Sequence, residues 1–374
     1  MPPDLNKQKS IAALSLVVET SNSTITSLIS YKAGDVADSP LTDQSVLHKD
    51  LLSLFSLLQV STTKLSLALK PSSPTYGASL GPLKDLVDQI SALSHCVHLY
   101  HHNLGITLTQ EVGSVTSDII QSVRVLCQTF LDNEINNTRT STGQPGDEYM
   151  VRTGAVHDLI NKAKVPGGLS VDNVSAVRKK LTQDHASLED ALSEVCDMAS
   201  ETQVSSEDNM DDEDDGWGLL GMKSKRMDTA EVYAILRLST LLHKNIIEDV
   251  LSTDVLSLAA VTPRAAQHLD TLPPHSSALL AASDDLISTL YAPQNLSEIA
   301  TELSSFLDVV RQLHSSLTVI YENPSSLVQQ MAQINLRDGN SKNLKKWFDV
   351  CFDQVGKAAE VLRTTLDLDT KNST

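Results

Sequence analysis

The segment ETQVSSEDNMDDEDDGWGLL, residues 201–220, divides the chain into two leucine-rich parts. Residues 201–215 contain eight carboxylates and no lysine or arginine. Clustered like charges repel one another and have little apolar surface to bury, so a segment of this composition is typically disordered. We therefore expect a disordered acidic linker at residues 201–227, between one domain at residues 1–200 and a second at residues 228–374.

Both parts are predicted to be helical. Apolar residues recur at spacings of three and four, and strand-like alternation is absent over any useful length. Long helices joined by short loops indicate antiparallel bundles. The predicted fold class is therefore all-α, with two helical bundles joined by the linker. The predicted helices span residues 5–32, 42–70, 82–102, 107–134, 149–164 and 170–199 in the first part, and 229–251, 276–291, 296–321, 325–336 and 341–366 in the second.

The charge of the chain restricts its partners. The formal net charge is −18. Binding to a nucleic-acid backbone needs clustered lysine and arginine, so the composition predicts no direct nucleic-acid binding and no adsorption to anionic membranes. Basic proteins or basic helices are the partners that electrostatics favours.

The cysteines and the N-terminus indicate a cellular compartment. Four cysteines lie far apart without a CxxC pair, which is neither a zinc spacing nor a disulfide framework and suits a reducing compartment. The chain opens with polar and charged residues rather than a secretory signal. Because no uncharged apolar run reaches the roughly 18 residues of a membrane helix, we expect a protein of the cytoplasm and nucleus.

Three histidines are the only candidates for a metal site. His95, His98 and His102 are spaced i, i+3 and i+7, hence on one face of a predicted helix, and three imidazoles can bind zinc. No glutamate lies between them as in HExxH. Histidine also suits the negative end of a helix dipole, so an ordinary helix end explains the cluster as well. We expect no bound metal.

Other motifs do not predict an enzyme. Residues 216–221 match GxGxxG, but acidic coil precedes the glycines where a dinucleotide site needs a strand. Leu51, Leu54, Leu58 and Leu65 span barely two heptads, fewer than a coiled coil needs, and predict an ordinary bundle face. No nucleophile motif, P-loop or specific carboxylate pair is present. We therefore expect neither catalysis nor a cofactor.

The acidic segment itself has two candidate roles. An acidic residue three positions after Ser205 makes this serine a phosphorylation candidate, although a merely solvated loop explains the pattern as well. Trp217 is a candidate for docking on a helical surface. The acidic residues that could interact with a partner are Glu207, Asp208, Asp211, Asp212, Glu213, Asp214 and Asp215.

Several stretches resemble one family in order along the chain. Gly105-Ile106-Thr107-Leu108, followed by Asp118-Ile119, resembles the most distinctive stretch of the cyclin-D-binding proteins, also called GCIP, the Grap- and cyclin-D-interacting proteins. An acidic break also follows where that family has one. Further similar positions are Lys180, Leu181, Asp184, Leu188, Ala191, Leu192, Glu194 and Val195 before the break, and residues 234–238, 284–286, Tyr291 and Pro293 after it.

The resemblance implies an all-helical, two-domain protein without catalysis, similar in architecture to vinculin and α-catenin. Such proteins are described as binding D-type cyclins and helix-loop-helix transcription factors. They are treated as negative regulators of cell-cycle progression and transcription in the nucleus and cytoplasm. The histidine cluster departs from the family pattern, as does the lack of a helix-loop-helix or zipper segment. The alternative is a helical scaffold that binds cytoskeletal partners.

Overall fold

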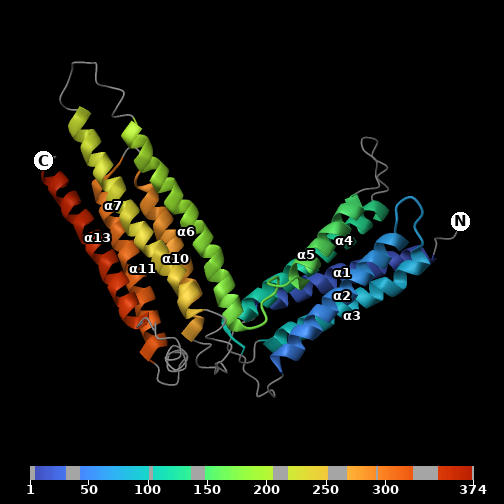
Figure 1. The fold of residues 1–374 in the computed structure, drawn as a ribbon. Coiled ribbons are helices and arrows are strands. Elements are labelled where there is room, and N and C mark those ends of the chain that lie inside the picture. The colour runs from blue at the N-terminus through green and yellow to red at the C-terminus, as the bar shows by residue number, and fades with distance from the viewer. Residues whose placement is uncertain are drawn as a thin grey trace. The chain divides into compact units, whose positions relative to one another are not determined.

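The computed structural model describes residues 5–30, 43–100, 104–135, 148–204, 218–251, 268–291, 294–322 and 344–372. Every regular element in these ranges is a helix, which confirms the all-α fold (Figure 1). The α-helices are α1 (Leu5–Ser30), α2 (Gln44–Ala68), α3 (Tyr76–Tyr100), α4 (Ile106–Ile135), α5 (Glu148–Lys164), α6 (Asn173–Val204), α7 (Gly218–Asn245), α10 (Leu272–Ser288), α11 (Leu296–Glu322) and α13 (Leu344–Asn372), and a π-helical turn at Ile246–Val250 continues α7.

The chain divides into two compact units, Met1–Ala176 and Val177–Thr374. This division differs from the predicted domain boundary at residue 200, because nearly all of α6 belongs to the second unit. The amphipathic pattern of α6 predicts a buried face, but it does not say which bundle covers that face. Around the predicted linker, α6 extends to Val204 and α7 begins at Gly218. Residues 205–217 lie outside the described residues, as does the predicted helix at residues 325–336.

The first unit is a bundle of α1 to α5, in which α1 packs on α3 and α4, and α2 packs on α3 and α5. Asp43 caps the start of α2 by accepting a hydrogen bond from the Ser45 amide at 2.9 Å. Leu51, Leu58 and Leu65 are fully buried. The leucine spacing of α2 is therefore a bundle face, as predicted, and each buried leucine contributes about 1.5–3 kcal/mol of transfer free energy.

By length and composition, α2 is also the one described helix able to cross a membrane. Lys49, Asp50 and Lys64 interrupt this helix, so it contains no uncharged apolar run of about 18 residues. Within the structure, 44% of that window is buried inside the protein. A core helix of a bundle passes the same test of length and hydropathy, so this feature is explained by packing against α3 and α5.

The turn between α3 and α4 requires glycine. Gly105 has a φ of 101°, in the left-handed region that favours glycine. A Cβ at this position would lie 2.0 Å from Cγ of Asn173, the first residue of α6. The buried Asn173 side chain in turn accepts a hydrogen bond from the Leu108 amide at 3.0 Å, which satisfies a free N–H in the first turn of α4. The distinctive stretch at residues 105–108 therefore fixes where α4 begins.

We predict that Gly105→Ala destabilises the first unit by at least about 2 kcal/mol, because a strained φ costs about 1–3 kcal/mol and the clash with Asn173 adds to it. Gly113→Ala is the matched control inside α4, where a Cβ meets nothing within 4 Å. Alanine should stabilise that helix by roughly 0.5–1 kcal/mol. Urea unfolding of both variants measures the difference. A Gly105→Ala protein as stable as the wild type would show that the turn tolerates a side chain.

In the second unit α7 packs on α13, α13 on α11, and α11 on α10, with α10 returning to α7. Two helices that contain proline begin earlier in the chain than predicted. The prediction starts the helix of α10 at residue 276, but α10 begins at Leu272 and accommodates proline in its first turn, where no N–H is needed. In the first unit, α3 likewise begins at Tyr76 and contains Pro82 in its interior, whereas the prediction starts the helix there.

Candidate functional site

A groove of about 710 Å³ lies on the second unit, lined by α6 and α7. Leu192 of α6 and Leu238 of α7 are half-buried in it, while Leu241 is 48% exposed. Ala234 also lines the groove and is exposed, so its small side chain leaves room. Because residues 234, 238 and 241 are spaced i, i+4 and i+7, they form one apolar stripe along α7.

Charged side chains border this apolar stripe. Arg237 and Lys244 are exposed on α7. On α6, Glu189 Oε1 lies 3.4 Å from Nε2 of His185. Lys244 Nζ lies 3.8 Å from Glu248 Oε1 one turn further along α7, whereas Arg237 has no carboxylate at ion-pair distance in the part of the chain that the structure describes. The groove thus combines an apolar floor with two cations on its α7 side.

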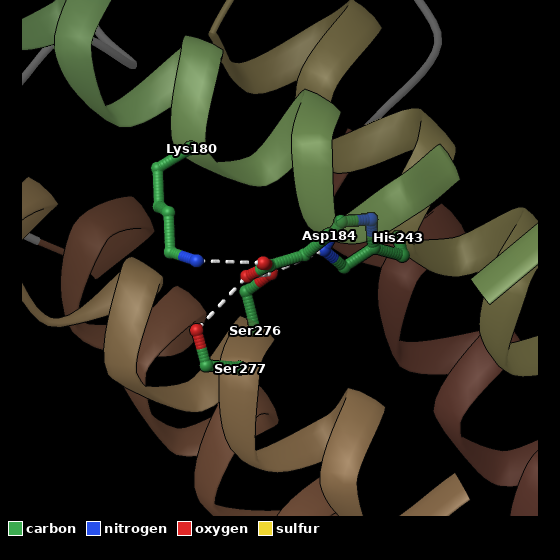
Figure 2. A network of polar contacts seen from close by, with 5 residues as sticks. All are labelled: Lys180, Asp184, His243, Ser276 and Ser277. Atoms are coloured by element: carbon green, nitrogen blue, oxygen red, sulfur yellow. Dashed lines mark hydrogen bonds and ion pairs between the residues drawn. The ribbon is translucent and has the colours of Figure 1, made fainter. Parts of the chain in front are cut away.

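A buried carboxylate joins α6 to α10 beside this groove. Asp184 of α6 is 4% exposed. Its Oδ1 accepts a hydrogen bond from Lys180 Nζ at 2.8 Å, and its Oδ2 accepts from Ser276 Oγ at 2.8 Å and from Ser277 Oγ at 3.0 Å. Figure 2 shows these side chains converging on the carboxylate. An ionised carboxylate can be buried here because each of its oxygens accepts a hydrogen bond.

His243 of α7 extends the network to a third helix. Its Nε2 lies 2.7 Å from Ser276 Oγ. Since the one hydroxyl proton of Ser276 goes to Asp184, His243 must donate from Nε2, and its Nδ1 is then a bare acceptor. That Nδ1 is buried without a hydrogen-bond partner among the described residues. The ring stacks on His185 of α6, with ring centroids 5.5 Å apart, so α6 also contacts α7 through two imidazoles.

The network contains a serine, a histidine and an aspartate, but not in the order of a hydrolytic triad. In a triad the histidine lies between the other two and takes the proton of the serine. Here Ser276 lies between His243 and Asp184 and donates its proton directly to the carboxylate. Ser276 is also only 1% exposed, so no substrate reaches it. The arrangement is suited to joining three helices.

A second groove, of about 520 Å³, is lined by α11 and α13. His314 of α11 stacks on Phe352 of α13 at a centroid distance of 4.2 Å, and its Nε2 lies 3.0 Å from Asp349 Oδ1. Asp353 is paired with Lys357 at 2.7 Å. Arg363 also lines this groove and donates a hydrogen bond to Ser304 Oγ at 3.0 Å. With two arginines and two aspartates in its lining, the groove does not select one sign of partner.

The structure describes only part of the predicted sites. His95 is exposed on α3, and His98 Nδ1 lies 2.6 Å from the Ser94 carbonyl oxygen, while His102 lies outside the described residues. Among described residues, no group of three histidine, cysteine or carboxylate side chains could hold a metal ion. Ser205, Trp217 and the acidic residues from Glu207 to Asp215 also lie outside the described residues. Residues 218–221 of the GxGxxG match are helical and begin α7.

Neither the groove nor the roles of His243, Ser276 and Ser277 were predicted from the sequence. A weak signal existed for the network, because Lys180 and Asp184 have the i,i+4 spacing of a helical ion pair. His243 was also an isolated polar residue among the apolar positions of its helix. Ser276, however, is 92 positions from Asp184 in the chain, and no local pattern joins the two.

The described residues form an all-helical protein with an apolar groove on its second unit. No catalytic arrangement of side chains is found among these residues. Two family models match the chain, namely Grap2 and cyclin-D-interacting, N-terminal, at residues 50–201, and Grap2 and cyclin-D-interacting, C-terminal, at residues 207–315. Together they cover more than half of the chain, in the expected order. The chain belongs to this family, which confirms the resemblance. No curated protein matches the chain.

We predict that acid destabilises the second unit through His243. Burial, with the neighbouring imidazole of His185, lowers the pKa of His243 to about 4 against the opposing charge of Asp184. The unfolded chain, with an ordinary histidine pKa of about 6.5, binds the proton first, so stability falls as the pH drops from 6.5 toward 4. Each unit of pKa difference corresponds to about 1.4 kcal/mol.

Urea unfolding of the wild type and of His243→Gln at pH 7 and pH 5 tests this prediction. Glutamine can donate to Ser276 but cannot gain a proton, so the variant should lose less stability between the two pH values. The same loss in both proteins would exclude His243 as the cause.

Proposed function

We propose that the chain is a non-enzymatic regulatory protein that binds a D-type cyclin through the groove on α6 and α7. The observation that carries the proposal is the position of this groove relative to the family matches. Its α6 residues fall in the match at residues 50–201, and its α7 residues fall in the match at 207–315. The α13 side of the other groove, at residues 349–363, lies beyond both matches.

The shape and chemistry of the groove suit a helix. An amphipathic helix binds by placing apolar residues spaced i, i+3 or i+4, and i+7 into an apolar groove. The stripe at residues 234, 238 and 241 presents the same spacing on α7. Leu192 of α6 adds a further apolar side chain to the groove. One exposed and two half-buried leucines form this apolar surface, and charged residues border it, as is typical of docking surfaces.

Sequestration of a partner helix accounts for the regulatory part of the proposal. A helix bound in the groove is withheld from its other partners, so binding lowers the activity that the helix supports. Helix-loop-helix transcription factors and Grap2 are further candidate partners. Negative regulation of cell-cycle progression and transcription would then take place in the nucleus and cytoplasm. The cytoskeletal scaffold has only the bundle architecture in its favour, and a fold alone does not define function.

We predict that Ala234→Trp weakens cyclin binding at least about tenfold, equivalent to ~1.4 kcal/mol. Ala234 is exposed in the groove, so the indole would fill the groove without entering the core. Isothermal titration calorimetry with a purified D-type cyclin measures the affinity.

Ala281→Trp is the matched control, because Ala281 is an exposed alanine on α10 that does not line the groove. It should bind cyclin as the wild type does, and circular dichroism should show both variants folded. If neither variant weakens binding, cyclin binds elsewhere; if the wild type does not bind cyclin, the proposed function is wrong.

A further inference from the structure

We propose that the groove on α6 and α7 selects an acidic amphipathic helix. This inference rests on the proposed function, because it assigns the chemistry of the partner segment to the same groove. It also differs from what the composition suggests. A chain with a net charge of −18 favours basic partners overall, whereas the local charges at this groove favour the opposite sign.

The apolar part of the groove sets the length of the bound segment. The lining residues of α7 run from Tyr233 to Lys244, about three helical turns or ~17 Å at 1.5 Å per residue. A partner helix of roughly ten to twelve residues covers that length. Its contact face needs apolar side chains one turn apart, opposite Ala234, Leu238 and Leu241. The room above Ala234 admits one large side chain from the partner.

The cations of α7 set the charge of the bound segment. Arg237 and Lys244 are seven residues apart, which places them two turns apart on the same side of α7. Lys244 also lies 3.8 Å from Glu248, which does not line the groove, whereas Arg237 has no carboxylate at ion-pair distance among the described residues. Two carboxylates with the same spacing on a partner helix would lie opposite them. On the α6 side, Glu189 is already close to His185. A partner with lysines facing α7 would place like charges together, which costs affinity and suppresses wrong partners.

The other groove provides an internal comparison. At α11 and α13, Asp349 lies beside His314 and Asp353 is paired with Lys357. Arg311 is likewise paired with Asp308 at 2.7 Å. The lining of this groove carries two arginines, Arg311 and Arg363, and two aspartates, Asp349 and Asp353, so charges of the two signs balance there. The α6–α7 groove is lined by two cations but one carboxylate, Glu189. Selection by charge is therefore a property of the α6–α7 groove and not of every hollow between helices in the second unit.

Two designed helical peptides test the inference directly. Both have leucines at i, i+4 and i+7, and they differ only in carrying glutamates or lysines beside these positions. Fluorescence anisotropy with the full chain at low ionic strength measures binding. The acidic peptide should bind at least about tenfold more tightly than the basic one, and added salt should reduce the difference because it screens exposed charges.

Charge variants locate the effect. Arg237→Glu combined with Lys244→Glu should remove or reverse the preference. The control combines Lys84→Glu on α3 with Lys162→Glu on α5, two exposed lysines of the first unit, and changes the net charge by the same amount. This control should keep the preference for the acidic peptide. Ala234→Trp should weaken the binding of both peptides. Equal affinities for the two peptides, or a preference that both double variants alter equally, would overturn the inference.

The same proteins separate this inference from the proposed function. If cyclin binds and Ala234→Trp abolishes its binding, but the acidic peptide has no advantage, then the charge selection is wrong and the function stands. If the acidic peptide binds in the groove but cyclin does not bind, the function is wrong and the charge selection stands.

Discussion

The buried carboxylate of Asp184 is the interaction on which the binding surface depends. It accepts hydrogen bonds from a residue of its own helix and from two serines of α10, and Ser276 connects it to His243 of α7. An isolated buried charge is strongly unfavourable, so α6 and α10 must stay together for the carboxylate to keep its partners. The network therefore fixes the position of α6, and α6 provides one side of the groove.

The groove and the network serve different purposes on neighbouring faces of the same helix. Asp184 points toward α10 and is buried, while Glu189 and Leu192, one and two turns further along α6, line the groove. Burial of the polar groups fixes the register between the helices, and the partial exposure of the leucines leaves apolar surface for a partner. The charge at this surface is positive on α7 although the chain as a whole is strongly acidic, so net charge describes the solubility of the molecule better than it describes its site.

Local patterns predicted much of the fold. The helix periodicity, the cap at Asp43 and the glycine at Gly105 each act within a few residues. The periodicity predicted the helical fold correctly. The predicted helix starts at Pro82 and at residue 276 are too late in the chain, because α3 begins at Tyr76 and α10 begins at Leu272. The site was not predictable in the same way. Asp184 meets Ser276 only after α6 has packed on the second unit, and an amphipathic pattern does not specify which bundle buries it.

Hydrogen–deuterium exchange of the full chain with Asp184→Ala tests most directly whether this carboxylate holds α6 in place. If the carboxylate holds α6, exchange should be faster along α6 from residue 177 to residue 198 and along the facing part of α7. Exchange in α11 and α13, whose contacts do not involve Asp184, should remain as in the wild type. Unchanged exchange in α6, or an equal increase across all helices of the second unit, would show that Asp184 does not hold α6 in place.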